Sequence, residues 1–163
     1  MTTNATNGLS GGNIALGKAT LAAGTTTTHS TTGTLPYAIQ GQVYSRTALT
    51  NAATPTTDAV TGAAFRALSA DQASIFVFCL DSAGATKVAQ GPIVTLSQVT
   101  GKLSAVPFPA LTDALCPIGY LYAQAGTTLS GTWLFGTNNL SGVSGMTYTF
   151  RDLCLLPSQP ITA

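Results

Sequence analysis

Few side chains in this sequence have the chemistry of a catalytic group, and those few are far apart. His29 is the only histidine, five aspartates supply all the carboxylates, and glutamate is absent. A Ser-His-Asp triad would need His29, which lies in a Thr-rich run at residues 25–32 that we expect to be a solvated loop. Among the aspartates, Asp81 fits a turn, and Asp152 follows Arg151 in an expected edge strand. We therefore predict that the chain is not an enzyme.

Two arrangements resemble binding motifs but lack a required feature. The string GNIALGKA at residues 12–19 is close to a phosphate-binding loop, yet Ala19 replaces the hydroxyl residue that would hold Mg²⁺. A zinc site would have to combine His29 with cysteines, but structural zinc sites use closely spaced ligand pairs, which this sequence lacks. We expect buried core thiols, no metal and no cofactor. The cysteines are Cys79, Cys116 and Cys154.

The composition argues against several classes of partner. Charged residues make up 7% of the chain and the net charge is +1, whereas an average soluble domain has about 25% charged residues. The Lys and Arg residues are scattered, so we expect no nucleic-acid partner. No apolar run approaches the ~20 residues of a membrane span, and we see no secretory signal. A near-neutral surface favours a subunit that lies against other subunits.

Residues 1–36 differ from the rest of the chain, being rich in Thr, Gly, Ala and Asn with few large apolar residues. Such a segment cannot bury enough surface to order itself alone. We predict an extended N-terminal arm that becomes ordered against a neighbouring molecule, with a disordered tail as the alternative. Deletion of residues 1–30 should then leave a folded domain that has lost its partner. The expected contact residues are Leu9, Ile14, Leu16 and Leu21.

Residues 37–163 have the pattern of a β-domain. Alternation of apolar and polar residues predicts a strand over 37–48, with Ile39 and Val43 on one face. Residues 74–81 are apolar at nearly every position, which predicts a central strand buried on both faces. The string DSAG at 81–84 predicts a hairpin turn. Further strands are expected at 63–68, 86–90, 93–96, 102–108, 116–123, 133–135 and 145–156.

The number and spacing of these segments define the expected fold. About seven to nine short strands, with turn signals about every ten residues, favour a sandwich or barrel. We therefore predict an all-β fold for residues 37–163, a β-sandwich or jelly-roll-like barrel. Trp133, Tyr120 and Tyr122 are expected to be core or interface anchors, and the alternative is an exposed platform that binds a glycan.

Several strings, taken in order, resemble a group of structural proteins of tailed bacteriophages, the head decoration (cement) or head-fibre type. The resemblance covers most of residues 36–160. The strings are AIQGQVY at 38–44, SIFVF at 74–78, LDSAG at 80–84, VAQGPIV at 88–94, CPIGY at 116–120, TWLFG at 132–136 and LLPSQP at 155–160. No catalytic residue is carried over, because this family has no catalytic motif.

The resemblance implies a non-enzymatic virion structural protein that binds and stabilises the outer surface of a capsid. Its partners would be the major capsid protein and further copies of itself, with a trimer favoured over a dimer. The virion would be assembled in the host cytoplasm, and the N-terminal arm would thread between neighbours. The alternative function is a carbohydrate-binding fibre or host-recognition module on the virion, with Trp133, Tyr120 and Tyr122 as its platform.

Overall fold

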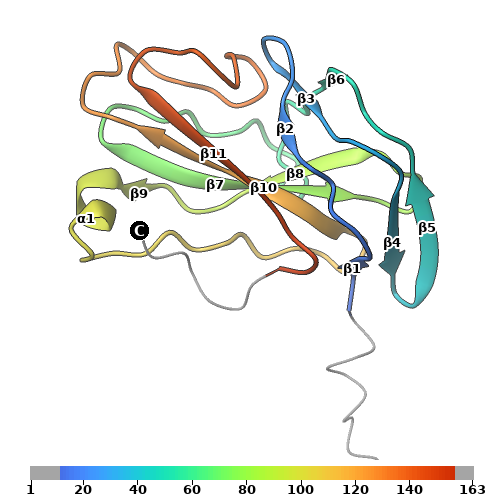
Figure 1. Cartoon of the computed structure of the whole chain (residues 1–163). Helices are drawn as coiled ribbons and strands as arrows, with labels where there is room; N and C mark the ends of the chain where they lie inside the picture. The colour runs from blue at the N-terminus through green and yellow to red at the C-terminus, as the bar shows by residue number, and fades with distance from the viewer. Residues whose placement is uncertain (1–11, 157–163) are drawn as a thin grey trace, which may run out of the picture.

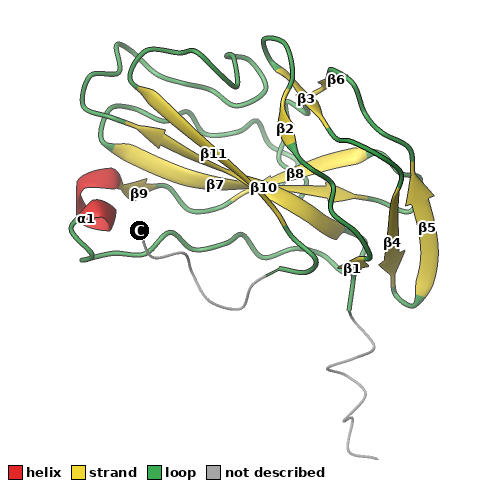
Figure 2. Cartoon of the chain, viewed as in Figure 1, coloured by secondary structure: helices red, strands yellow, loops and turns green. Residues whose placement is uncertain are grey.

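The computed structural model of the chain describes residues 12–156. These residues form eleven β-strands, in three antiparallel sheets, and one short helix (Figure 1, Figure 2). The predicted all-β class is confirmed, and the arrangement of the sheets is consistent with a β-sandwich. The described strands do not close into a barrel, so the sandwich is the form that the fold takes.

Five strands form the central sheet: β7 (Gln72–Leu80), β8 (Thr86–Gln90), β9 (Val94–Thr95), β10 (Cys116–Ala125) and β11 (Met146–Asp152). Their order is β11-β10-β7-β8, and β9 also pairs with β7. β7 is buried along nearly its whole length because both faces of the sheet are covered, as its apolar sequence predicts. The predicted turn at 81–84 joins β7 to β8, with Gly84 at φ +76°.

One face of the central sheet packs against the larger part of the core. Phe76 and Phe78 of β7 point to this face and meet Trp133 and Phe135 from the segment between β10 and β11. The rings of Phe76 and Phe135 are stacked, with centroids 4.5 Å apart. Aromatic pairs of this kind add to the stabilisation from burial alone, so this cluster anchors the sandwich.

The predicted strands at 63–68 and 133–135 are wrong. The backbones of the two segments pair only through an isolated bridge between Leu68 and Trp133. A turn follows at once, because the Asn138 side chain accepts a hydrogen bond from Leu134 N–H at 2.6 Å and Asn138 N–H donates to Leu134 O. Asparagine favours such local hydrogen bonds over a sheet ladder.

The other face of the central sheet is covered by the helix α1 (Leu96–Thr100) and the segment that follows it. Asp71 fixes the start of α1, since its carboxylate accepts hydrogen bonds from both N–H and Oγ of Ser97 at 2.8 Å. The predicted strand at 102–108 is wrong: these residues form no strand, and Val106 fills the second core cluster with Val99 of α1. The predicted strand at 93–96 is shortened to β9.

The predicted N-terminal arm is largely wrong, because residues 12–36 belong to the folded domain. They contribute β1 (Ile14–Ala15), β2 (Ala22–Ala23), β3 (Thr28–Ser30) and the start of β4 (Leu35–Ile39). β1 pairs with β4, and β3 pairs with both β2 and β6 (Ala52–Ala53). The boundary at residue 36 therefore falls inside a strand. Residues 1–11 lie outside the described residues.

Buried side chains and long-range backbone hydrogen bonds explain why this Thr-rich segment is ordered. Ala19 is fully buried and Leu21 is nearly so, and both belong to the main core. The backbone is satisfied as well, since Ala15 N–H donates to Cys154 O at 2.7 Å and Leu21 N–H donates to Asp152 Oδ1 at 3.0 Å. The segment cannot bury enough surface by itself, and the rest of its own chain supplies the core and the hydrogen-bond acceptors that order it.

The single strand predicted over 37–48 is a hairpin of two strands, β4 and β5 (Gln42–Arg46). Gln40 has φ +49° and Gly41 has φ +81°, the two positive values that a two-residue hairpin turn requires. The reversal puts Ile39 and Val43 on opposite faces, whereas a continuous strand would put them on one. The hairpin projects at one edge of the domain, where β5 is the outermost strand (Figure 1).

Candidate functional site

The β1-β4-β5 sheet has one face turned to the core and one turned away from it. Ala15, Leu35, Tyr37 and Ile39 point inward and belong to the main core cluster. The residues that alternate with them point outward, as strand geometry requires. The register places Ile14, Ala38 and Val43 in one row across the three strands. We call the outward side the outer face, and its residues are Ile14, Leu16, Pro36, Ala38, Val43 and Ser45.

The outer face carries no charged residue and is mostly apolar. Val43 is 69% exposed and Leu16 is 52% exposed, which makes them two of the most exposed large apolar residues of the described chain. Apolar side chains gathered on one side of an exposed sheet favour contact with another protein surface. Ile14 and Leu16 are among the contact residues predicted from the sequence, while Val43 was missed because the turn at Gln40 was not foreseen.

The other two predicted contact residues do not join this face. Leu21 is 6% exposed and packs over Gly119 of β10, where a Cβ atom would come within 2.9 Å of the Leu21 side chain. Leu21 is therefore a core residue, and its prediction as a contact is wrong. Leu9 lies outside the described residues.

His29 is buried, so the prediction of a solvated loop around it is wrong. It lies in β3 and its ring packs against Phe78 with centroids 5.2 Å apart. Its Nε2 is 3.3 Å from Thr86 Oγ1 and its Nδ1 is 3.4 Å from Thr54 Oγ1. Burial lowers the pKa of His29 to about 4, which keeps the imidazole neutral at pH 7. Its partners are hydroxyls and not a carboxylate, so the described contacts give it a structural role.

Two carboxylates, those of Asp58 and Asp81, line one cavity of about 480 Å³. Asp58 accepts hydrogen bonds from the N–H groups of Val60, Thr61 and Gln90, at 2.6–2.8 Å. Burial alone would raise the pKa of Asp58, but these bonds outweigh it and leave the pKa lowered.

Asp81 is held in the same way by its own turn, as the sequence predicts. Its Oδ1 accepts hydrogen bonds from the N–H groups of Ala83 and Ala85 at 3.0 and 2.9 Å. Lys87 Nζ lies 3.9 Å from its Oδ2. Both carboxylates of the cavity therefore act as turn-stabilising acceptors.

The thiols divide into two groups. Cys79 and Cys116 are buried, and burial raises the pKa of Cys79 and raises that of Cys116 to about 12. Cys154 is exposed, which contradicts the prediction that all three thiols are buried. It follows β11, where the chain leaves the sheet edge. Among residues 12–156, no three His, Cys or Asp side chains gather in a way that could hold a metal ion.

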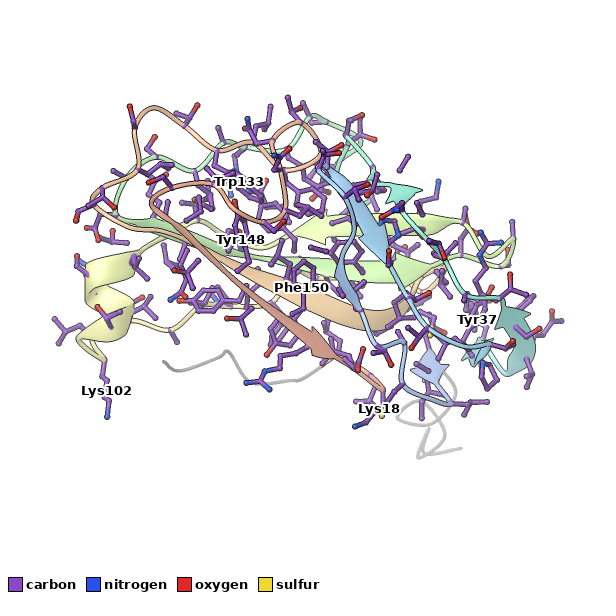
Figure 3. All side chains as sticks on the ribbon, turned by 45° about the horizontal axis from the view of Figure 1, so that its top comes forward. Lys18, Tyr37, Lys102, Trp133, Tyr148 and Phe150 are labelled. Atoms are coloured by element: carbon purple, nitrogen blue, oxygen red, sulfur yellow. The ribbon has the colours of Figure 1, made fainter. Side chains whose placement is uncertain are left out.

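The aromatic residues proposed as a glycan platform do not form one. Trp133 is 1% exposed, belongs to the main core and packs against Tyr148 of β11 (Figure 3). Tyr120 and Tyr122 lie on β10 and pack with the second core cluster, on the opposite face of the sheet. The three rings thus lie on different sides of one layer, and the interpretation as core anchors holds for Trp133 and Tyr122.

No family model matches the chain, and neither a curated protein nor a solved structure matches it. Within residues 12–156, no helix is both long and apolar enough to span a membrane. Features of the described domain that remain available to partners include the outer face, a cavity beneath the tip of the β4-β5 hairpin, and the neighbouring cavity that Asp58 and Asp81 line.

Proposed function

We propose that this chain is a non-enzymatic structural protein of a bacteriophage virion that binds and stabilises the outer surface of the capsid. Its partners are the major capsid protein and further copies of itself, with a trimer favoured over a dimer. The observation that carries the proposal is the outer face. It offers Leu16 and Val43 to a partner on a rigid sheet without a charge that would have to be desolvated.

The physical properties of this face suit a subunit that is repeated many times on a shell. Each bound copy removes a modest apolar area from water, and this burial stabilises the contact by about 25 cal/mol per Å² of apolar surface. One such contact is weak, but an oligomer that presents several copies at once gains avidity. None of the six outer-face residues is charged; Lys18 projects near β1, two residues after Leu16, and Lys102 projects at the far end of the domain by α1 (Figure 3).

Two further observations support a structural role. The ordered strings of residues 38–160 resemble decoration and head-fibre proteins of tailed phages. The groups with catalytic potential are also committed to the fold, since His29 is buried between threonines and Asp58 holds a turn. A structural domain of this kind resists deformation through many small contacts, and this role requires no catalysed reaction.

Capsid binding of outer-face variants tests the proposal. Leu16→Asp combined with Val43→Asp puts two charges on the outer face, and because both positions are exposed the domain should remain folded. The matched control combines Leu103→Asp with Val60→Asp, at exposed positions outside this sheet. Co-sedimentation with heads assembled without this protein measures binding, and light scattering measures the oligomeric state.

We expect the outer-face variant to lose at least about tenfold in affinity for heads and to shift towards the monomer, while the control variant behaves like the parent. Equal binding of the two variants would reject the outer face as the contact surface. Failure of the parent chain to bind heads would reject the capsid function itself.

A further inference from the structure

A cavity of about 280 Å³ lies beneath the tip of the β4-β5 hairpin, where the hairpin faces the turn between β7 and β8. It is on the core side of the hairpin, so it is separate from the outer face. No residue that lines it carries a charge. The lining residues are Ile39, Gln40, Gln42, Tyr44, Ser82 and Ala114.

The aromatic wall of the cavity is held rigidly. The ring of Tyr44 stacks on the ring of Tyr37, with centroids 5.5 Å apart and planes 25° from parallel. Tyr37 is buried, and its hydroxyl donates to Asp81 O at 2.8 Å. One face of Tyr44 is thus occupied by Tyr37, while the half-exposed ring borders the cavity. A ring fixed in this way loses little conformational entropy when a ligand packs against it.

The polar groups of the cavity are oriented and still available. Tyr44 Oη donates to Gln42 Oε1 at 2.9 Å, which fixes the amide and leaves its NH₂ group as a donor. The side chains of Gln40 and Ser82 are exposed and have no hydrogen-bond partner among residues 12–156. An amide, a second amide and a hydroxyl therefore offer both donors and acceptors to one small volume.

The frame around these groups is also fixed. Asn13 Oδ1 accepts a hydrogen bond from Gln40 N–H at 3.0 Å, and Asn13 Nδ2 donates to the carbonyls of Asp113 and Leu115 at 2.8 and 2.9 Å. Asn13 thus ties the hairpin tip to the segment that contains Ala114. The width of the cavity is set before any ligand arrives.

We propose that this cavity binds a neutral sugar residue. A pyranose has a C–H face that packs on an aromatic ring and a rim of hydroxyls that both donate and accept hydrogen bonds. The ring of Tyr44 can pack on the C–H face. The hydroxyl rim can exchange hydrogen bonds with the polar side chains of Gln40, Gln42 and Ser82. The uncharged lining of this first cavity favours a neutral sugar over an acidic one, because a carboxylate or phosphate would find no cation among the six residues that line it.

A neighbouring cavity extends the site to an oligosaccharide. It shares Ala114 with the first cavity and begins at Asp81, next to Ser82. Its polar lining combines threonines with Asp58, Asp81 and Lys87, the last lying 3.9 Å from Asp81 Oδ2, and its volume is about 480 Å³. A chain of two or more sugar units can therefore pass from Tyr44 over the β7-β8 turn, where threonine hydroxyls and the carboxylates of Asp58 and Asp81 can accept hydrogen bonds from its hydroxyl groups. The threonines that line this second cavity are Thr57, Thr86 and Thr112.

A glycan array tests the proposal, with neutral hexose, deoxyhexose and N-acetylhexosamine oligosaccharides beside sialylated and uronate-containing ones. The best neutral trisaccharide is then titrated into ¹⁵N-labelled full-length chain. We expect shifts at Gln40, Gln42, Tyr44 and Ser82. Gln42→Ala should weaken binding about three- to tenfold through loss of an oriented donor. Gln98→Ala, at an exposed position of α1, is the matched control and should bind like the parent.

Tyr44→Phe gives a second variant that keeps the aromatic ring. It removes only the hydroxyl that orients Gln42, so it should weaken binding less than Gln42→Ala while the fold is unchanged. Binding to no neutral glycan, a preference for acidic glycans, or equal binding by Gln42→Ala and the parent would each overturn the proposal. The sugar site and the capsid contact are separable, because Gln42→Ala should keep its affinity for heads and the outer-face variant should keep its affinity for the glycan.

Discussion

The Nε2 atom of His29 lies 3.3 Å from the hydroxyl of Thr86, so an imidazole joins the small β2-β3-β6 sheet to β8 of the central sheet. The second ring nitrogen is 3.4 Å from the Thr54 hydroxyl, and Phe78 packs on the ring. No described hydrogen bond or ion pair brings a carboxylate to this imidazole. The neutral ring therefore fits the site, and the charged ring would be buried without a counter-charge.

The first prediction concerns acid stability. The pKa of His29 falls from 6.5 to about 4 on folding because of burial, so the unfolded chain takes up the proton first as the pH drops. The contribution of the neutral ring is complete above pH 6.5 and is lost between pH 6.5 and pH 4. It amounts to about 3 kcal/mol of unfolding free energy. Urea unfolding at several pH values between 7.5 and 4 measures this loss.

His29→Gln is the control for that titration. Glutamine keeps a donor and an acceptor for the two threonines but does not titrate. We expect its unfolding free energy to be lower at pH 7.5 and much flatter between pH 6.5 and pH 4. A variant whose acid profile has the same slope as the parent would show that another group causes the loss.

The second prediction concerns Asp58, which accepts hydrogen bonds from Val60, Thr61 and Gln90. Asp58→Asn replaces one carboxylate oxygen with an NH₂ group, which leaves at least one buried N–H without its acceptor. We expect a loss of about 1–3 kcal/mol at pH 7, measured by urea unfolding. The folded pKa of Asp58 is lowered, so its contribution is present at neutral pH and is lost as the pH falls below its ordinary value of 3.8. The variant should therefore converge on the parent in strong acid.

The third prediction concerns truncation. Deletion of residues 1–11 leaves every described contact in place, so the shortened chain should unfold cooperatively at the parent's temperature. Deletion of residues 1–30 removes β1, Leu21 and His29 together, and we expect it to abolish cooperative unfolding. Circular dichroism melting curves distinguish the two. A cooperative transition in the longer deletion would restore the interpretation of this segment as an arm.

The fourth prediction concerns the thiols. The native chain should react with a disulfide reagent at one fast site, Cys154, because Cys79 and Cys116 are buried with raised pKa values. All three thiols should react in denaturant. Cys154→Ser should remove the fast phase and keep the slow ones. Two fast thiols in the native chain would mean that the core opens readily, at the second cluster if the extra thiol is Cys79 and at the main cluster if it is Cys116.

The sequence predicts the long strands well because each has an unambiguous pattern. β7 is apolar on both faces and lies at the centre of the sheet, and β8 has the predicted bounds of 86–90. In β11 the alternation of Met146, Tyr148 and Phe150 correctly indicates the side that packs on the core. Periodicity suffices where a strand is long enough to show it.

The short elements could not be predicted in this way. β1, β2 and β6 have two residues each, which is too few for a period, and five of these six residues are alanines. The burial of His29 depends on Thr54, Thr86 and Phe78, which are distant in sequence. The outer face and the cavity beneath the hairpin tip both depend on the Gln40-Gly41 turn, for which a Gly preceded by a polar residue was the available signal.

The hydrogen bond from Leu21 N–H to Asp152 Oδ1 spans 131 positions of the sequence, and that from Ala15 to Cys154 closes the same loop. During synthesis, β1 can pair with β4 early, but the bonds of Ala15 to Cys154 and of Leu21 to Asp152 form only after β10 and β11 have left the ribosome. Folding of this domain is therefore a late event that completes many distant contacts together, and it should be slow for its size. An interrupted chain lacks these contacts, so only a chain extended past β11 completes the hydrogen bonds that hold β1 and Leu21 in place.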